Sequence, residues 1–501
     1  MSLISTIMVD RSSPKPLTQQ IYEQLELAIK NGQILFGSRL PSIRDLSLQL
    51  KVNKIAAVTA YERLCDEGLV VSRPGSGFFA AQKARKTPLA ATSQTANLVA
   101  PIALEPSQFS SQWFNRRFLP LDAVKHESHA PLGGSHAPAD QIPFDELRSA
   151  ARHVLMESSA LNLTYEHPQG LLELRERIAG ELEIRNILLT GSSQVLITSG
   201  ALQALNLALN ALCQPGDTVA VEVPSLSLLF PILARRKLKL LEMNRDFEGI
   251  NLTSELENDF KRLKPKVFVV TPDFHNPTGG TLSLVQRHKL LRYAEELGSM
   301  IIELDVFHGL QFGDTITPPI SALDGLKNTI HISSYSKTLA SGLRIGHIAA
   351  SQELIQKMTE IKTLSEISGS SLDQSIVSEL LKRGFMRKHL LKVRDVYRGR
   401  RDTLNAMLRK LSPQGSQWNM PEGGLFMWFA FPEQGPVPSE IDAWALDRKV
   451  LLAPGCLFYP EGRASHHMRI NYALLEPVTT YRALETVFGL WRAAASRRWK
   501  K

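Results

Sequence analysis

The sequence has few cysteines and no long hydrophobic run. Its three cysteines, Cys65, Cys213 and Cys456, are too few and too far apart for a disulfide framework or a cysteine-ligated metal site. No apolar stretch reaches the roughly 18 residues that span a bilayer. The first residues also lack the charged and then apolar pattern of a secretory signal. We therefore expect no metal, no membrane association and a reducing, cytoplasmic compartment.

The chain also lacks an excess of acidic residues. It carries 58 Lys and Arg against 49 Asp and Glu, for a formal net charge of +9. A basic balance suits an anionic partner without identifying one. With 501 residues the chain is long enough for about three domains. Its 43% hydrophobic content is ordinary for a globular protein with packed cores.

Residues 1–81 have the pattern of three helices followed by a β-hairpin. Apolar residues recur at helical spacing over 17–31, 42–50 and 54–67. Short apolar runs on either side of Pro74-Gly75-Ser76-Gly77 predict the hairpin. This is the order of a winged helix-turn-helix. Its third helix would enter the major groove, and its wing would lie along the DNA backbone or the minor groove.

The segment resembles the DNA-binding domain of GntR-type regulators. The resemblance is carried by the run from Gly37 to Leu46 and by the run from Arg73 to Gly77. It implies that Ser42 and Arg44 contact DNA from the second helix. It also implies that the tip of the wing, where small residues let the backbone approach a phosphate, is formed by Gly75, Ser76 and Gly77.

The recognition helix departs from this family, which usually begins it with hydroxyl and arginine side chains. Asn53, Lys54 and Thr59 are the polar candidates for DNA contact. Ile55 and Ala56 either meet thymine methyl groups or pack inside the domain. Residues 1–85 carry 11 Lys and Arg against 7 Asp and Glu, a net charge of +4. This modest charge predicts weak non-specific binding, so an operator site would need two such domains and hence a dimer.

Residues 82–130 have the composition of a flexible linker. From about residue 82 to 111 the chain is rich in Ala, Thr, Ser, Pro and Gln, with no helical or strand period. Trp113, Phe114 and Phe118 indicate that part of the remainder packs against another surface.

Residues 131–496 alternate strand-like apolar runs with helical patterns. The runs lie at 195–198, 218–222, 267–271, 300–304, 330–334 and 348–350. This alternation predicts an α/β unit with a mainly parallel sheet. In such a sheet, functional residues lie at the carboxyl ends of the strands.

One lysine, Lys337, lies among hydroxyl residues at the end of such a run. Ser334 and Ser336 precede it, and Arg344 follows seven residues on, between two glycines. A lysine amine can form a Schiff base with an aldehyde. Hydroxyls and a guanidinium can bind a phosphate. Pyridoxal phosphate offers both groups. The alternative is a loop lysine with a surface arginine.

The lysine segment resembles that of fold-type I aminotransferases, and other motifs of that family follow in order. Gly200 and Ala201 begin a helix directly after a strand, where backbone amides bind phosphate. Asn276, in the run Asn276-Pro277-Thr278-Gly279, would donate to the phenolic oxygen of the cofactor. A plain turn is the alternative for that run.

Two further motifs match the part of this family that binds substrate. Tyr165 begins a segment that, in the family, reaches the site of the neighbouring subunit. Arg469 matches the arginine that binds a substrate carboxylate bidentately. The alternative for Arg469 is a surface salt bridge. The resemblance adds a smaller α+β subdomain to the predicted sheet.

Two contacts of the family are missing. After the strand that ends at Glu303, the family has an aspartate for the pyridinium nitrogen and, three residues on, a tyrosine for the phenolic oxygen. Leu304 and Phe307 stand there. The carboxylate matters because it keeps the ring nitrogen protonated and the ring an electron sink. Asp305 would replace it only if the strand ends or bulges, since side chains alternate between faces. The stretch from Glu222 to Ser227 also lacks the usual stacking aromatic residue.

An aminotransferase-like body behind a GntR-type domain resembles the MocR-type transcription regulators. The resemblance implies a homodimer on a double-stranded DNA operator. Its effector would be pyridoxal phosphate in a Schiff base with Lys337, an amino-acid adduct of it or a related metabolite. Because the carboxylate is missing, we expect a regulator with weak or absent transamination. Two alternatives remain open: a working aminotransferase fused to a DNA-binding domain, and a cofactor-free regulator that uses the fold only to dimerise.

Overall fold

The computed structural model describes two compact units, one built mainly on residues up to 99 and the other on residues from 100 onward. The residues described are 7, 9–11, 13, 15–30, 34, 38–66, 69–73, 77–80, 100–109, 130–157, 164–314, 317–474 and 476–498. Most of the predicted linker, with Trp113, Phe114 and Phe118, lies outside them. Within that linker, however, Ile102–Ala103 forms a strand of the main sheet.

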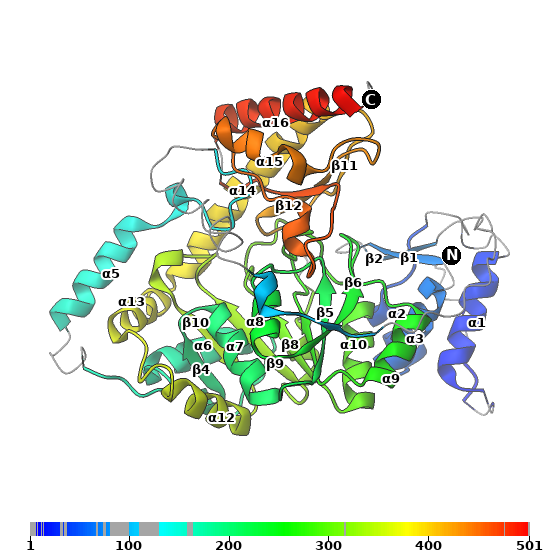
Figure 1. Ribbon diagram of the computed structural model, residues 1–501. Helices are drawn as coiled ribbons and strands as arrows, with labels where there is room; N and C mark the ends of the chain where they lie inside the picture. The colour runs from blue at the N-terminus through cyan, green and yellow to red at the C-terminus, as the bar shows by residue number, and fades with distance from the viewer. Residues whose placement is uncertain are drawn as a thin grey trace. The chain divides into compact units, whose positions relative to one another are not determined.

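The N-terminal unit has the predicted order of three helices and a hairpin (Figure 1). Its elements are α1 (Leu17–Lys30), α2 (Ile43–Leu50), α3 (Lys54–Asp66), β1 (Val70–Arg73) and β2 (Gly77–Ala80). The amide of Asp45 donates to Ser42 Oγ at 3.1 Å, which caps α2. The ring of Tyr61 on α3 stacks on Phe78 on β2 with 4.4 Å between centroids. This contact fixes the hairpin to the third helix.

The C-terminal unit is organised around a sheet that has eight strands in the described part of the chain. The order is β3-β6-β5-β7-β8-β9-β10-β4; the strands from β6 to β9 are parallel, and the others pair antiparallel. The strands are β3 (Ile102–Ala103), β4 (Val195–Thr198), β5 (Thr218–Val223), β6 (Lys239–Asn244), β7 (Val267–Val270), β8 (Met300–Leu304), β9 (Thr329–Ser334) and β10 (Gly346–Ala349). All six predicted runs are strands, so the mainly parallel sheet is confirmed.

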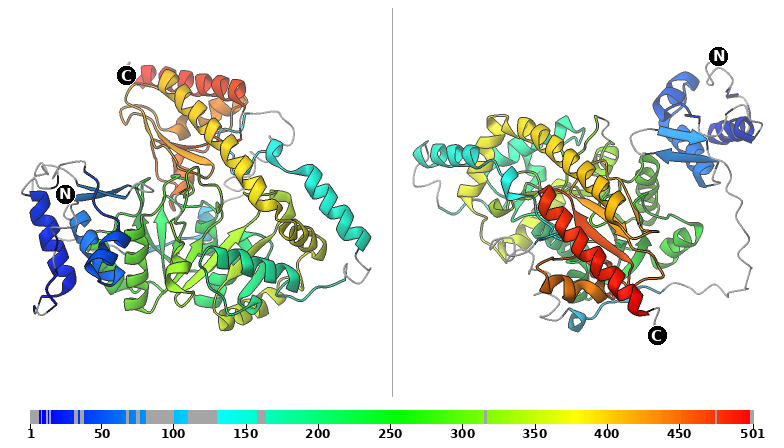
Figure 2. Two further views of the ribbon diagram at one scale, coloured as in Figure 1. Left: turned by 180° about the vertical axis from the view of Figure 1, so that it is seen from behind. Right: turned by 90° about the horizontal axis from the view of Figure 1, so that it is seen from above.

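Helices cover both faces of this sheet, as Figures 1 and 2 show. The alternation of side chains along β4 assigns Leu196 to one core and Val195 and Ile197 to the other. The first core is completed by α7 (Ala201–Leu212), α8 (Leu229–Arg235) and α12 (Gln352–Thr363). The second is completed by α5 (Phe144–Glu157), α6 (Leu172–Ile184) and α13 (Ser371–Lys382). Three further helices are α9 (Ser254–Leu263), α10 (Leu284–Leu297) and α11 (Ile320–Asp324).

A smaller antiparallel sheet forms the predicted α+β subdomain. It consists of β11 (Gln417–Trp418), β12 (Phe426–Ala430) and β13 (His467–Asn471). It packs with α14 (Phe385–Leu411), α15 (Pro438–Asp447) and α16 (Pro477–Arg498) around Phe429, Phe488 and Trp491. The long helix α14, yellow in Figure 2, leads from α13 to this subdomain. Arg469 lies on the central part of β13, opposite Trp428.

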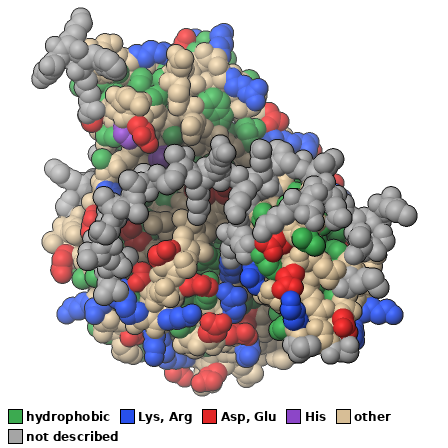
Figure 3. Space-filling view, turned by 90° about the vertical axis from the view of Figure 1, so that its right-hand side faces the viewer, with side chains coloured by type: hydrophobic (Ala, Val, Ile, Leu, Met, Phe, Trp, Pro, Cys, Tyr) green, Lys and Arg blue, Asp and Glu red, His purple; other side chains and the backbone are tan. Residues whose placement is uncertain are grey.

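No helix in the described ranges combines the length and apolarity that a bilayer span requires. On the face drawn in Figure 3, Lys and Arg side chains lie among Asp and Glu side chains along the lower part. The net positive charge of the chain is therefore not gathered into one field over that part of the surface.

A buried ion pair joins the carboxyl ends of β5 and β6. Arg245 pairs with Glu222, and both side chains are fully buried. Arg245 also donates to the carbonyls of Thr271 and Gly280 at 2.9 Å each, while the amide of Thr271 donates to Glu222 at 2.7 Å. Burial raises the pKa of the Glu222 carboxyl, against the opposing effect of Arg245. The network holds both ends of the 271–280 loop, which carries Asn276.

We expect Arg245→Met to lower the free energy of unfolding of this unit by about 3–5 kcal/mol, because it leaves the Glu222 carboxylate buried without its counter-charge. Urea denaturation measures the loss. Adding Glu222→Gln should recover part of it, since the amide still accepts from Thr271 without a charge. The matched control is Arg148→Met, which removes an exposed pair with Asp145 and should cost less than about 1 kcal/mol. Equal effects at the two arginines would contradict this account.

Candidate functional site

Lys337 lies where the sheet topology predicts a functional residue, just beyond the carboxyl end of β9. Its ammonium group donates to the carbonyl of Ser135. The segment around Gly133 and Ser135 therefore lies against the lysine, although more than 200 residues separate them in the sequence. Sequence reasoning did not identify this segment as part of the site.

The predicted phosphate-binding residues come together beside the lysine. Ser334 Oγ and Ser336 Oγ are 3.0 Å apart, and Arg344 Nη1 donates to Ser336 Oγ at 3.2 Å. Arg344 Nη2 donates to the carbonyl of Ser199 at 2.8 Å. Gly200 follows as the N-cap of α7, at φ +88°. A Cβ atom there would lie 2.7 Å from Arg344 Nη2, so a larger residue would force the guanidinium to shift, and the positive φ also favours glycine.

This cluster has the physical properties of an anion site. It combines a guanidinium, two hydroxyls and the N-terminus of α7, at which Ala201 is the first helical residue. Orphan amides and the helix dipole favour negative charge at such an end. The guanidinium adds a fixed positive charge and donors in a planar fork. The structure thus brings Ser334, Ser336, Arg344 and the start of α7 to one place.

Arg469 and Asn276 form a second cluster. Arg469 Nη1 donates to Asn276 Oδ1 at 2.7 Å, and Nη2 donates to the carbonyl of Gly133 at 2.6 Å. The guanidinium carbon lies 4.3 Å from the ring centroid of Phe426 and 4.9 Å from that of Phe458. Arg469 is buried, which excludes the surface salt bridge considered as its alternative. The arrangement can offer a positive charge to a carboxylate within a closed environment.

Leu304 and Phe307, at which the sequence predicts the two missing contacts, are buried apolar side chains. Leu304 is buried in the core between the sheet and α7. Phe307 is buried with its ring edge on Phe426, at 5.6 Å between centroids. Neither side chain can hold a proton or donate a hydrogen bond.

Asp305 points away from that core. Its carboxylate pairs with Arg185, the C-cap residue of α6, and lies 3.7 Å from His331 Nε2. Burial alone would raise the pKa of Asp305, but Arg185 and His331 hold it well below its usual range. Leu304 and Asp305 thus face opposite sides of the sheet, as the alternation of a strand requires. This geometry gives no support to Asp305 as the partner of a pyridinium nitrogen.

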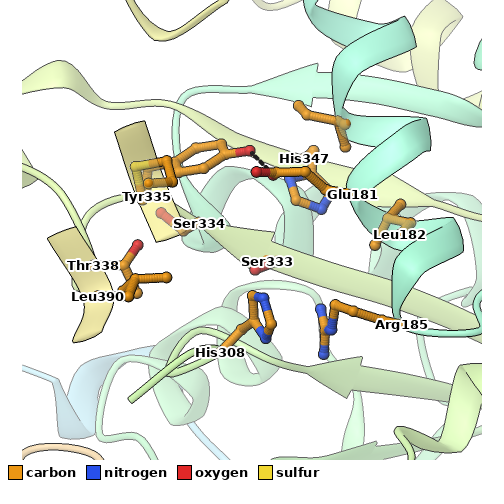
Figure 4. A pocket seen from close by; sticks show the side chains of 12 residues that line it. Glu181, Leu182, Arg185, His308, Ser333, Ser334, Tyr335, Thr338, His347 and Leu390 are labelled. Carbon is orange, nitrogen blue, oxygen red and sulfur yellow. Dashed lines mark hydrogen bonds between the residues drawn. The ribbon is translucent and has the colours of Figure 1, made fainter. Parts of the chain in front are cut away.

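A small cavity of about 40 Å³ lies beside the lysine segment, as Figure 4 shows. Tyr335 donates from its hydroxyl to Glu181 at 2.9 Å across it, and Arg185 lines its other side. Burial and the charge of Arg185 lower the pKa of His308 to about 3. Burial likewise lowers the pKa of His347. This volume is enough to hold a few water molecules. Histidines within apolar runs were the sequence signal for this cluster, which the sequence analysis missed.

Tyr165 is 80% exposed. Such exposure suits a side chain that a neighbouring subunit would cover. Its role in the site of a partner stays a prediction.

The predicted DNA-binding residues that the structure describes lie at or next to α2 and α3 and at the start of β2. Arg44 and Lys54 are exposed, as a phosphate or base contact requires. Thr59 Oγ1 donates to the carbonyl of Ile55 at 3.0 Å, and Asn53 Oδ1 accepts from the amide of Ile55 at 3.2 Å. Ser42 is engaged as the cap of α2. Gly75 and Ser76 lie outside the described residues, so their place at the wing tip stays a prediction.

Ile55 is 64% exposed at the first turn of α3, whereas Ala57 and Val58 are buried. It is therefore not a packing residue of the domain, and its contact with a thymine methyl group stays a prediction. Arg39 was not singled out from the sequence. Its Nε atom lies 3.3 Å from the position of a Cβ at Gly77, which has φ +101°. Arg39 therefore adds an exposed cation beside the wing.

The sequence matches two family models. Aminotransferase class I and II matches residues 133–487, and the gntR family of bacterial regulatory proteins matches residues 17–80. The chain belongs to the aminotransferase class I and II family, with a GntR-type domain in front of it. This is the architecture of the MocR-type regulators, and the resemblance found in the sequence is confirmed.

Curated relatives share both parts. The HTH-type transcriptional regulator NorG of Staphylococcus aureus is 28% identical over 435 residues, which cover 87% of this chain and 95% of that protein. The uncharacterized HTH-type transcriptional regulator YisV of Bacillus subtilis is 28% identical over 475 residues, covering 94% of this chain and 95% of that protein.

Solved aminotransferases share the fold of the C-terminal unit. The multiple substrate aminotransferase of Thermococcus profundus has a TM-score of 0.71 at 26% identity, covering 78% of this chain and 99% of that one. LysN, the α-aminoadipate aminotransferase of Thermus thermophilus complexed with N-(5'-phosphopyridoxyl)-L-leucine, has a TM-score of 0.70 at 28% identity, covering 75% and 95%. The fold-type I architecture is confirmed, and it is a fold that binds pyridoxal phosphate.

We expect Arg44→Ala to weaken binding to a DNA fragment that the wild-type protein selects from a random library by about 1–3 kcal/mol, because an exposed cation is lost from the DNA face. Gel shifts over a range of salt concentrations measure the affinity. Arg387→Ala on α14 removes a matched exposed charge and should leave the affinity unchanged. An Arg44→Ala protein that binds as tightly as wild type would remove Arg44 from the interface.

Proposed function

We propose that this chain is a DNA-binding transcription regulator that acts as a homodimer on a double-stranded operator in the cytoplasm. Its effector is pyridoxal phosphate or an amino-acid adduct of it. The observation that carries the proposal is the anion site of Arg344, Ser334 and Ser336 beside Lys337, in a unit that lacks the carboxylate at position 304. The relatives named as HTH-type transcriptional regulators support the DNA-binding part.

The residues present match most of the chemical groups of the cofactor. Ser334, Ser336 and Arg344 would hold the phosphate, and the glycine at position 200 leaves the guanidinium the room it needs. Lys337 is the amine for covalent attachment. Asn276 is the neighbour for the phenolic oxygen, and Arg469 already orients it through a 2.7 Å hydrogen bond. When bound, the cofactor supplies an aldehyde and an electron-withdrawing ring.

The same residues do not fit the demands of transamination. Leu304 cannot keep a ring nitrogen protonated, because it is an apolar side chain in a packed core. Phe307 cannot donate to a phenolic oxygen. The chain therefore has the groups that bind and orient a ligand without the group that makes the ring a strong electron sink. This disfavours the working aminotransferase. The cofactor-free regulator is disfavoured by the close fit of Arg344 against Gly200.

We expect added pyridoxal phosphate to give a visible absorbance band and, after borohydride reduction, a covalent adduct that peptide mass mapping locates at Lys337. Lys337→Ala should lose the adduct, whereas Lys357→Ala, at an exposed lysine on α12, should keep it. Absence of the adduct in a protein that still binds DNA would favour the cofactor-free regulator.

Leu304→Asp should make stability depend more strongly on the cofactor. The new carboxylate is buried without a partner in the free protein, which costs several kcal/mol, and a protonated ring nitrogen would compensate for it. Thermal denaturation should therefore show a larger rise in Tm on adding pyridoxal phosphate for Leu304→Asp than for wild type. Leu304→Asn, which is similar in size but uncharged, is the control. Equal rises in all three proteins would show that position 304 does not face the ring.

A further inference from the structure

We infer that His136 is a ligand-contacting residue that determines which small molecules this cleft accepts. Its imidazole donates to the carboxylate that Arg469 binds, and it takes up a proton when that carboxylate arrives. The inference rests on the proposed role of Arg469.

The backbone holds His136 between the two cations of the site. Ser135, its neighbour, accepts from the ammonium group of Lys337. The carbonyls of Gly133 and Gly134, just before it, accept from Arg469 Nη2 at 2.6 and 3.3 Å. Asn471 Nδ2 donates to the carbonyls of both Gly134 and His136 at 3.1 Å. These bonds fix the position of the residue before any ligand binds.

The ring of His136 has hydrogen-bonding capacity that the described part of the chain does not use. Both ring nitrogens are buried, and neither has a hydrogen-bond partner there. A neutral imidazole has one donor and one acceptor. Burying such groups without a hydrogen-bond partner costs free energy, because they lose their hydrogen bonds to water and gain none in return. A ligand that brings an oxygen to the ring recovers that cost.

A histidine N–H near Arg469 would give a bound carboxylate a further donor. Arg469 Nη1 already donates to Asn276, and Nη2 donates to the two glycine carbonyls. These bonds use three of the five N–H donors of the guanidinium. A carboxylate that also accepts from His136 therefore depends less on the donors that Arg469 has left.

Charge makes the contact sensitive to pH. Burial, with the charges of Lys337 and Arg469, lowers the pKa of His136 to about 4. These are the charged groups that act on the ring; Asn471, which touches its backbone, is neutral. The free site therefore holds a neutral imidazole at physiological pH. A bound carboxylate offsets the positive charge and raises the pKa of His136, so the carboxylate binds more tightly as the pH falls.

The test is calorimetric titration of the full-length protein with lactate, a carboxylate that is ionised at both pH values, without added cofactor, at about pH 8 and about pH 5.5. If the bound carboxylate raises the pKa of His136 by about 2 units, affinity for the wild type rises about fourfold at the lower pH. His136→Gln keeps a donor but cannot titrate, so it should bind as wild type does at the higher pH and lose the pH dependence. His136→Phe lacks the donor as well and should bind about three- to tenfold more weakly at the higher pH.

Each result decides one step. If His136→Gln retains the wild-type pH dependence, the role of His136 is overturned while the role of Arg469 stands. If Arg469→Gln binds lactate as tightly as wild type, or wild type does not bind it, the carboxylate site itself is overturned. Circular dichroism at both pH values shows whether each variant is folded. A variant that fails this check is replaced by His136→Asn, for which the expectations are those for His136→Gln.

Discussion

The close approach of Arg344 to the backbone at Gly200 is the constraint on which the candidate site depends. The guanidinium spans from the start of α7 to Ser336, and it can do so because residue 200 has no Cβ. Two strands of the main sheet and the helix α7 thereby meet at the positively charged guanidinium of Arg344. Lys337 is held beside that point by the same segment. Any residue larger than glycine would displace the guanidinium, whatever the rest of the sheet did.

The side chains at positions 304 and 305 lie on opposite faces of β8. At position 304 the strand turns a leucine into the core beneath α7, and at position 305 it turns an aspartate to the other face, toward Arg185 and His331. If the predicted register is right, the carboxylate that an aminotransferase of this fold would use at the ring is replaced here by an apolar side chain. The adjacent carboxylate of Asp305 pairs with Arg185 and lies near His331 on the other face. A one-residue difference in register separates the two arrangements, because side chains alternate along a strand.

The fold could be predicted from the sequence because the patterns that indicate it are short and local. The order of helices and hairpin in the first unit, the strand runs of the second and the residues around Lys337 each depend on short patterns of apolar and small residues. The segment at Gly133–His136 could not be found in this way. It reaches Lys337 and Arg469 only through contacts between residues more than 200 positions apart, and its residues match no short motif. The exposure of Ile55 was equally undetermined, since a helix of this length has several possible buried faces.

A regulator and an aminotransferase require different properties of the same cleft. Recognition requires affinity and orientation, which Arg344, Lys337 and Arg469 can provide as fixed charges. Turnover requires in addition that the ring withdraw electrons strongly, which depends on a protonated nitrogen. A sensor that kept this last property would consume the molecule it reports on. Leu304 at the position predicted for the carboxylate therefore removes a group that turnover requires, whereas the cations that can bind a ligand, Arg344, Lys337 and Arg469, are retained.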